Sequence, residues 1–111
     1  MSRPLRIQYP DAWYHVMNRA RRGQELFPDK EDMEVFLALL NETATMFNLK
    51  VSAYCLMPNH WHFVLWPEHD GDLPAFMQRL TTKHVRRWQL HRGKVGTGHV
   101  YQRRYKSFPV E

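Results

Sequence analysis

The 111-residue chain has one cysteine, Cys55, and lacks any apolar run near the roughly 18 residues that a membrane-spanning helix needs. A single cysteine cannot form an internal disulfide, and the apolar run around it predicts a buried, inert thiol. The N-terminus is charged but has no apolar segment of the kind that follows in a secretory signal. Repeats and low-complexity stretches are also missing. These absences predict one cytoplasmic globular domain over residues 1–111, with no membrane partner.

Carboxylates are missing from a long C-terminal stretch. Residues 1–72 hold seven basic and ten acidic side chains, whereas residues 73–110 hold nine basic and no acidic ones, and Glu111 follows. A soluble surface normally mixes both signs, so this stretch indicates a surface for a polyanion, most plausibly nucleic acid; the alternative is a solvated helix face. The candidate phosphate-binding residues are Arg79, Lys83, Arg86, Arg87, Arg103, Arg104 and Lys106.

Turn residues and β-branched or aromatic runs predict four strands, at residues 13–19, 50–57, 60–66 and 100–107. Apolar residues at three- and four-residue spacing predict two helices, at about residues 28–47 and 74–91. Asp29 is the expected cap of the first helix, and the glycine-rich stretch 93–98 is an expected loop. In the strand 50–57 we expect one face to carry Val51, Ala53, Cys55 and Met57.

The order of these elements is β-α-β-β-α-β. It predicts the α+β class and a ferredoxin-like fold, in which two helices cover one face of a four-stranded antiparallel sheet. The other face of the sheet has no cover from this chain, so a ligand is expected there.

His60 and His62 are the most informative pair. Two residues apart on a strand, they project from one face roughly 7 Å apart, while the bulky Trp61, Phe63 and Leu65 face the helices. Two imidazoles on an open face suit a metal site with free coordination positions; the alternative is two partly exposed histidines. The remaining histidines lack such a spacing partner, and we expect structural or solvent-exposed roles for His15, His69, His84, His91 and His99.

The hydrophobic-His-hydrophobic-His strand resembles the HUH motif of single-strand DNA endonucleases. The wider pattern resembles the REP-associated tyrosine transposases and other IS200-like transposases. The matching segments are Tyr14–Arg19, Leu26-Phe27, Tyr54–His62 and Gly98–Ser107. They lie in order over nearly the whole chain, so the resemblance is more specific than the histidine pair alone.

The resemblance implies an enzyme that cleaves and rejoins single-stranded or hairpin DNA through a 5′-phosphotyrosine intermediate. It implies Mg²⁺ or Mn²⁺ held by two histidines, which match His60 and His62, and by a third polar ligand. In the family that ligand and the nucleophilic tyrosine lie on a helix after the fourth strand. The chain reaches Glu111 before such a helix, so we expect a C-terminally short domain that binds DNA and metal without full catalysis, and a possible homodimer.

For several residues the sequence leaves more than one role open. Tyr101 and Tyr105 are expected to pack or stack, with Tyr105 a weak fallback nucleophile. Trp66 could stack a base, and Asn18 and Arg19 are possible neighbours of the metal on the open face.

Two other functions also fit. One is a non-catalytic module that binds single-stranded RNA or DNA, since such sheets stack bases on exposed aromatic rings. The other is a metal-dependent hydrolase, which would need acidic ligands from Glu68 or Asp70.

Overall fold

The computed structural model describes residues 12–69, 71–92 and 100–110. The elements are β1 (Trp13–Arg19), α1 (Lys30–Met46), β2 (Lys50–Met57), β3 (His60–Trp66), α2 (Asp72–Arg92) and β4 (Lys106–Val110). The strands form one antiparallel sheet in the spatial order β2-β3-β1-β4. The predicted element order and α+β class are confirmed. The predictions for Asp70, His99, the stretch 93–98 and the side chain of His91 fall outside the described residues.

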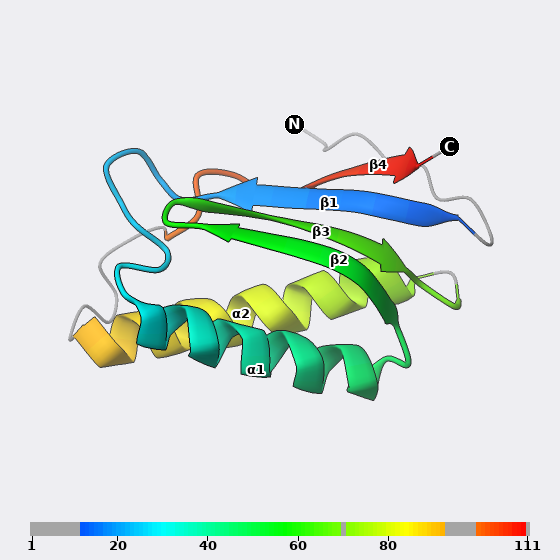
Figure 1. Cartoon of the computed structure of the whole chain (residues 1–111), viewed down its shortest axis with the longest axis horizontal. Coiled ribbons are helices and arrows are strands. Elements are labelled where there is room, and N and C mark those ends of the chain that lie inside the picture. The colour runs from blue at the N-terminus through cyan, green and yellow to red at the C-terminus, as the bar shows by residue number, and fades with distance from the viewer. Residues whose placement is uncertain (1–11, 70, 93–99, 111) are drawn as a thin grey trace.

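Both helices pack on the same face of the sheet (Figure 1). Alternate residues of the central strands point into this layer and are fully buried, namely Tyr14, Val16, Trp61, Phe63 and Leu65. The predicted helix stripes meet them with Phe36, Leu40, Ala44, Leu73, Phe76, Met77, Leu80, His84 and Trp88. Because this core takes every second residue of β1 and β3, the residues between them face the uncovered side.

The start of α1 follows its sequence signals. The side chain of Asp29 accepts a hydrogen bond from the backbone N–H of Asp32 at 2.9 Å, which caps the helix as predicted. Glu31 and Asp32 lie in the first turn, where the helix dipole favours negative charge. Within the described ranges, neither helix is both long and apolar enough to cross a membrane.

The strand β2 contains a register shift that the sequence pattern does not predict. Val51 pairs with Leu65, but Ala53 pairs with Val64, so one extra residue of β2 is inserted between the two pairs. An extra residue reverses the alternation of side chains, and Val51 therefore packs against the core on the helix-covered face. The prediction that Val51 shares a face with Ala53 and Met57 is wrong for this reason.

Cys55 lies beyond the register shift and pairs with His62. Its side chain is exposed. The predicted buried thiol is thus wrong, because the apolar residues around it belong to an edge strand whose outer face has no cover.

The fourth strand begins later than predicted, at Lys106 and not at residue 100. Val100 and Gln102 instead hydrogen-bond to the end of β1, through Arg21 N–H to Val100 O at 2.8 Å and Gln102 N–H to Arg19 O at 3.0 Å. These bonds hold residues 100–102 beside the end of β1, and a bend follows before β4 starts. Arg103 and Arg104 therefore lie in a bend at the rim of the sheet.

Candidate DNA and metal site

His60 and His62 project from β3 on the uncovered face of the sheet. Trp61 and Phe63, on either side of His62, are fully buried against the helices, so the pleat turns both imidazoles the other way. Their ring centroids are 5.1 Å apart and the rings are nearly perpendicular, at 85°. The structure places the pair as its spacing predicts.

A neighbour contacts the Nδ1 atom of each imidazole. Nδ1 of His60 lies 2.8 Å from Oδ1 of Asn59, an acceptor, which favours the tautomer of His60 that carries its proton on Nδ1. Nδ1 of His62 lies 3.0 Å from Nε2 of His15. When His62 donates in this bond, both His60 and His62 present an unprotonated Nε2, which can coordinate a metal ion.

His15 is the member of the cluster that sequence reasoning missed. Its ring lies edge to edge with that of His62, with centroids 5.2 Å apart and planes 15° from parallel. In the register, Met17 lies opposite His62 and His15 lies opposite Val64, so His15 and His62 are diagonal neighbours. The signal that could have found His15 is the pairing of the strands, because the predicted fold puts β1 beside β3, with His15 on the uncovered face.

His62 has a lowered pKa. Burial lowers the pKa of His62 from its usual value of 6.5, and the charges of His15, His60 and Arg19 lower it further. The shift favours the neutral imidazole near pH 7, and only the neutral form binds metal.

The described residues contain no group of three or more histidine, cysteine, aspartate or glutamate side chains placed to hold a metal ion. They offer two imidazoles, His60 and His62, close enough to share one ion at metal–nitrogen distances of about 2 Å. This donor set fits an open site whose other positions go to water, substrate or a ligand elsewhere. Imidazole suits Mn²⁺ at least as well as Mg²⁺, which prefers oxygen ligands.

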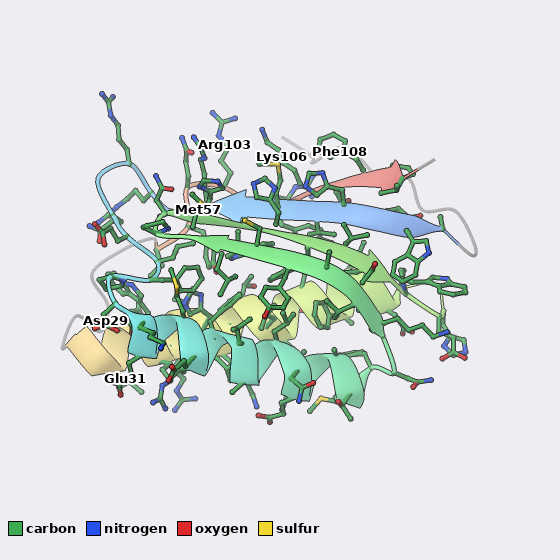
Figure 2. The ribbon with its side chains drawn as sticks, viewed as in Figure 1. Asp29, Glu31, Met57, Arg103, Lys106 and Phe108 are labelled. Carbon is green, nitrogen blue, oxygen red and sulfur yellow. The ribbon has the colours of Figure 1, made fainter. Side chains whose placement is uncertain are left out.

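A pocket of about 360 Å³ opens beside the histidines. It is lined by Met17, Asn18, Arg19, Gln102, Arg103, Arg104 and Lys106. Four of these residues are cationic and none is acidic, so the pocket suits a phosphate. Arg103 and Lys106 project on the side of the sheet away from the helices (Figure 2). We call this set the cationic pocket.

Arg19 connects the cationic pocket to the histidines, because it pairs with His60 across the sheet. Asn18 pairs with Trp61 and is only 8% exposed, and its Oδ1 accepts the backbone N–H of Arg19 at 2.8 Å. The prediction that both side chains lie on the open face is therefore right for Arg19 and wrong for Asn18.

The predicted cations of α2 lie elsewhere. This helix packs on one face of the sheet (Figure 1), and the histidines project from the other face, because Trp61 and Phe63 between and beside them are buried under the helices. Lys83 Nζ lies 3.5 Å from Glu42 Oε1 on α1, and Arg87 lines a small pocket with Glu31 and Asp32. The basic residues that the sequence suggests as one surface are thus only partly divided. Arg79, Lys83, Arg86 and Arg87 lie on α2 and Arg103, Arg104 and Lys106 near β4, but Arg86 lines one groove together with Arg103 and Arg104.

No tyrosine in the described part of the chain sits beside the histidine pair. Tyr14 is fully buried, and Tyr101 and Tyr105 are partly buried against the core. Tyr54 pairs with Phe63 and therefore lies on the helix-covered side of the sheet, away from the histidines. Tyr101 and Tyr105 line a groove of about 710 Å³ that also includes Met77 and Val85 of α2. The fallback nucleophile Tyr105 is not brought to His60 and His62.

Tyr101 is a structural residue, as predicted. Its hydroxyl accepts a hydrogen bond from Trp61 Nε1 at 2.9 Å and lies 2.7 Å from His84 Nδ1, to which it can donate. Burial strongly raises the pKa of Tyr101, while the bond from Trp61 lowers it slightly. His84, itself buried, also has a structural role as predicted.

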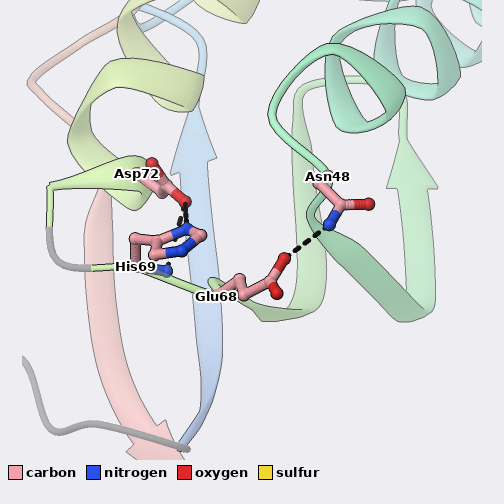
Figure 3. A network of polar contacts seen from close by, with 4 residues as sticks. All are labelled: Asn48, Glu68, His69 and Asp72. Atoms are coloured by element: carbon pink, nitrogen blue, oxygen red, sulfur yellow. Dashed lines mark hydrogen bonds and ion pairs between the residues drawn. The ribbon is translucent and has the colours of Figure 1, made fainter.

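Glu68 lies at the far end of β3 from His60. It accepts a hydrogen bond from Asn48, while His69 Nδ1 lies 3.4 Å from Asp72 Oδ2 (Figure 3). The strand between His62 and its last residue already spans about 13 Å. Glu68 therefore supplies no ligand to the histidine pair, which removes the one described acidic residue on which the hydrolase interpretation depended.

Trp66 shares the uncovered face with the histidines. Its ring centroid lies 5.4 Å from that of Trp13, and Lys50 Nζ lies 4.5 Å from the Trp66 centroid. Trp13 and Lys50 thus contact the Trp66 ring, and base stacking on Trp66 stays a prediction.

The fold and the site define a class of protein: a small α+β domain with a histidine pair beside a cationic pocket on the uncovered face of its sheet. The model of the family described as IS200-like transposases matches residues 8–111. The chain belongs to this family. None of the curated proteins matches it.

Two solved structures share the fold. One is a REP-associated tyrosine transposase bound to a REP hairpin, with a TM-score of 0.74 and 16% identity over all of this chain and 63% of that one. The other is a candidate transposase from Deinococcus radiodurans R1, with a TM-score of 0.70 and 21% identity over all of this chain and 87% of that one. This chain thus spans less than two thirds of the REP-associated transposase.

Proposed function

We propose that the uncovered face of the sheet binds single-stranded or hairpin DNA, with a backbone phosphate between the histidine pair and the cationic pocket. The observation that carries this proposal is the pairing of the strands. Arg19 of β1 pairs with His60 of β3. Met17 of β1 pairs with His62 on one side and with Lys106 of β4 on the other. These pairings put two cations next to two imidazoles on a face without a cover. Phosphate is the group that the two cations bind directly and that a metal ion held by the imidazoles would also bind.

His60 and His62 would hold Mg²⁺ or Mn²⁺ through Nε2, with Asn59 and His15 orienting the two rings. The bound ion would polarise a phosphoryl oxygen of the DNA. Arg19 and Lys106 would neutralise the same phosphate.

Strand cleavage through a phosphotyrosine needs a tyrosine that the described residues do not bring to the pair. For residues 1–111 we therefore propose DNA and metal binding, with cleavage dependent on a tyrosine from outside the described ranges. A homodimer stays a prediction.

The test compares two charge-matched double variants in binding to a fluorescein-labelled oligonucleotide of about 16 nucleotides, followed by anisotropy. Arg19→Ala with Lys106→Ala should weaken binding by about tenfold or more, because it removes two phosphate contacts. Arg79→Ala with Lys83→Ala removes the same charge from α2 and should change binding little. An equal loss in both variants would contradict the proposed face.

The metal is tested separately by titrating Mn²⁺ and following the free ion by electron paramagnetic resonance. His60→Ala with His62→Ala should abolish Mn²⁺ binding and reduce DNA affinity only in part. If that variant binds Mn²⁺ like the parent, the assignment of the site fails. The alternative, a non-catalytic module for single-stranded nucleic acid, predicts DNA binding by a parent protein that takes up no Mn²⁺.

A further inference from the structure

Phe108 is an exposed aromatic ring on the uncovered face. It lies on the edge strand β4, is 51% exposed, and projects away from the helices (Figure 2). A lone exposed apolar residue is ordinary on a protein surface. The position of this one, at the end of a row of rings leading to the histidine pair, makes it unusual.

The row crosses three strands. Phe108 pairs with His15, with ring centroids 6.4 Å apart and planes at 38°. The ring of His15 lies edge to edge with that of His62, with its Nε2 3.0 Å from Nδ1 of His62, and the ring of His62 lies 5.1 Å from that of His60. A flat ligand on Phe108 would therefore lie at one end of a row of rings whose other end is the proposed phosphate site.

The charge around Phe108 identifies the ligand. Lys106 lies two residues before it, on the same face and about 7 Å along the strand, and lines the cationic pocket. A ring beside a pocket with four cations and no carboxylate suits a group with a flat apolar part joined to an anion. An unpaired nucleotide has this chemistry, whereas a paired base offers no free face for stacking.

We propose that Phe108 is a nucleobase-stacking site that holds one unpaired base of single-stranded DNA next to the phosphate bound at the histidines. This inference rests on the proposed function and extends it to a second contact on the same strand. Stacking of this kind tolerates any base, because every base has a π-face. Phe108 would thus position the strand without reading its sequence.

The test uses Phe108→Leu, which keeps an apolar side chain on the exposed strand but removes the ring. Loss of one base stack should weaken binding of a single-stranded oligonucleotide by about 5- to 150-fold. Phe108→Trp should restore or improve it. Tyr54→Ala is the matched control, since Tyr54 is 55% exposed but follows the helix-covered face at the other edge of the sheet. Circular dichroism and thermal unfolding check that each variant is folded.

A second measurement places the base. Oligonucleotides with one abasic position are scanned against the parent and against Phe108→Leu. One position should weaken binding to the parent and have little further effect on the variant, which is the coupling expected of two groups in contact. Equal affinity of Phe108→Leu and the parent, or additive losses at every abasic position, would overturn the inference alone. Failure of the parent to bind single-stranded DNA, or no effect of Arg19→Ala with Lys106→Ala, would instead refute the proposed function.

Discussion

His15 should control the metal affinity of the site although it is not itself proposed as a ligand. Its Nε2 lies 3.0 Å from Nδ1 of His62 and can fix the tautomer that leaves Nε2 of His62 free. His15→Phe keeps a flat ring next to His62 but removes the acceptor, whereas His15→Gln keeps an acceptor near the same place. Losing such a partner of a metal ligand typically costs about 10- to 100-fold in metal affinity, or about 1.4–2.8 kcal/mol.

Two measurements follow this effect. In Mn²⁺ titrations, His15→Phe should bind about 10- to 100-fold more weakly than the parent, and His15→Gln should stay within a few-fold of it. Nitrogen-15 spectra of the metal-free protein should show His62 protonated on Nδ1 in the parent and His15→Gln, but not in His15→Phe. His69→Gln is the control, because His69 is exposed and bonded to Asp72. Equal Mn²⁺ affinity of His15→Phe and the parent would refute the reasoning.

Three further predictions concern salt, pH and stability. The logarithm of DNA affinity should fall linearly with the logarithm of salt, and Lys106→Ala should make the slope shallower by about 0.7, the value for one phosphate contact on a single strand. Because the folded pKa of His62 is lowered, the unfolded chain binds more protons below about pH 6.5. Thermal stability in EDTA should therefore decline as the pH drops below that value, and less so for His62→Gln. Tyr101→Phe leaves Trp61 Nε1 and His84 Nδ1 without their shared hydroxyl, so urea denaturation should show a loss of about 1–3 kcal/mol, while DNA affinity is unchanged.

Most of the fold is predictable from local sequence signals. The strands β1, β2 and β3 have the predicted bounds, and α1 begins at the predicted cap. Each depends on features within a few residues: alternation in Trp61, Phe63 and Leu65, turn chemistry, and a capping aspartate. Such signals suffice where the spacing of apolar residues in the sequence matches the side of the helix or strand that is buried in the fold.

The errors in strand register and strand bounds have non-local causes. The register shift in β2 is defined only by its partner strand, through the pairs Val51 with Leu65 and Ala53 with Val64. The late start of β4 follows from bonds that tie residues 100–102 to the end of β1. A run of residues that favour strands does not show with which segment of the chain its backbone N–H and C=O groups form hydrogen bonds.

The same limit applied to the site. His60 and His62 are neighbours in sequence, so their spacing alone predicts that they share the uncovered face. His15 lies 47 positions from His62, and its contact exists only because β1 and β3 are paired. The order of the strands therefore has to be predicted first. Residues on the neighbouring strand that face the same side of the sheet as His60 and His62 then become candidates for the site.

Charge shows the same limit, because the basic stretch is continuous in sequence but partly divided in space, with Arg86 the residue of α2 that lines a groove with Arg103 and Arg104. The helix α2 lies behind the sheet, beside acidic residues of α1, and Lys83 is within 3.5 Å of Glu42. β4 lies at the sheet edge next to β1, which places Lys106 beside Arg19 in a pocket without any carboxylate. Acidic residues of α1 therefore lie beside the cations Lys83 and Arg87 of α2, whereas the described residues that line the cationic pocket include four cations and no carboxylate. The sequence predicts that a polyanion binds, and under the proposed function the histidine-bearing face is the one whose field would attract it.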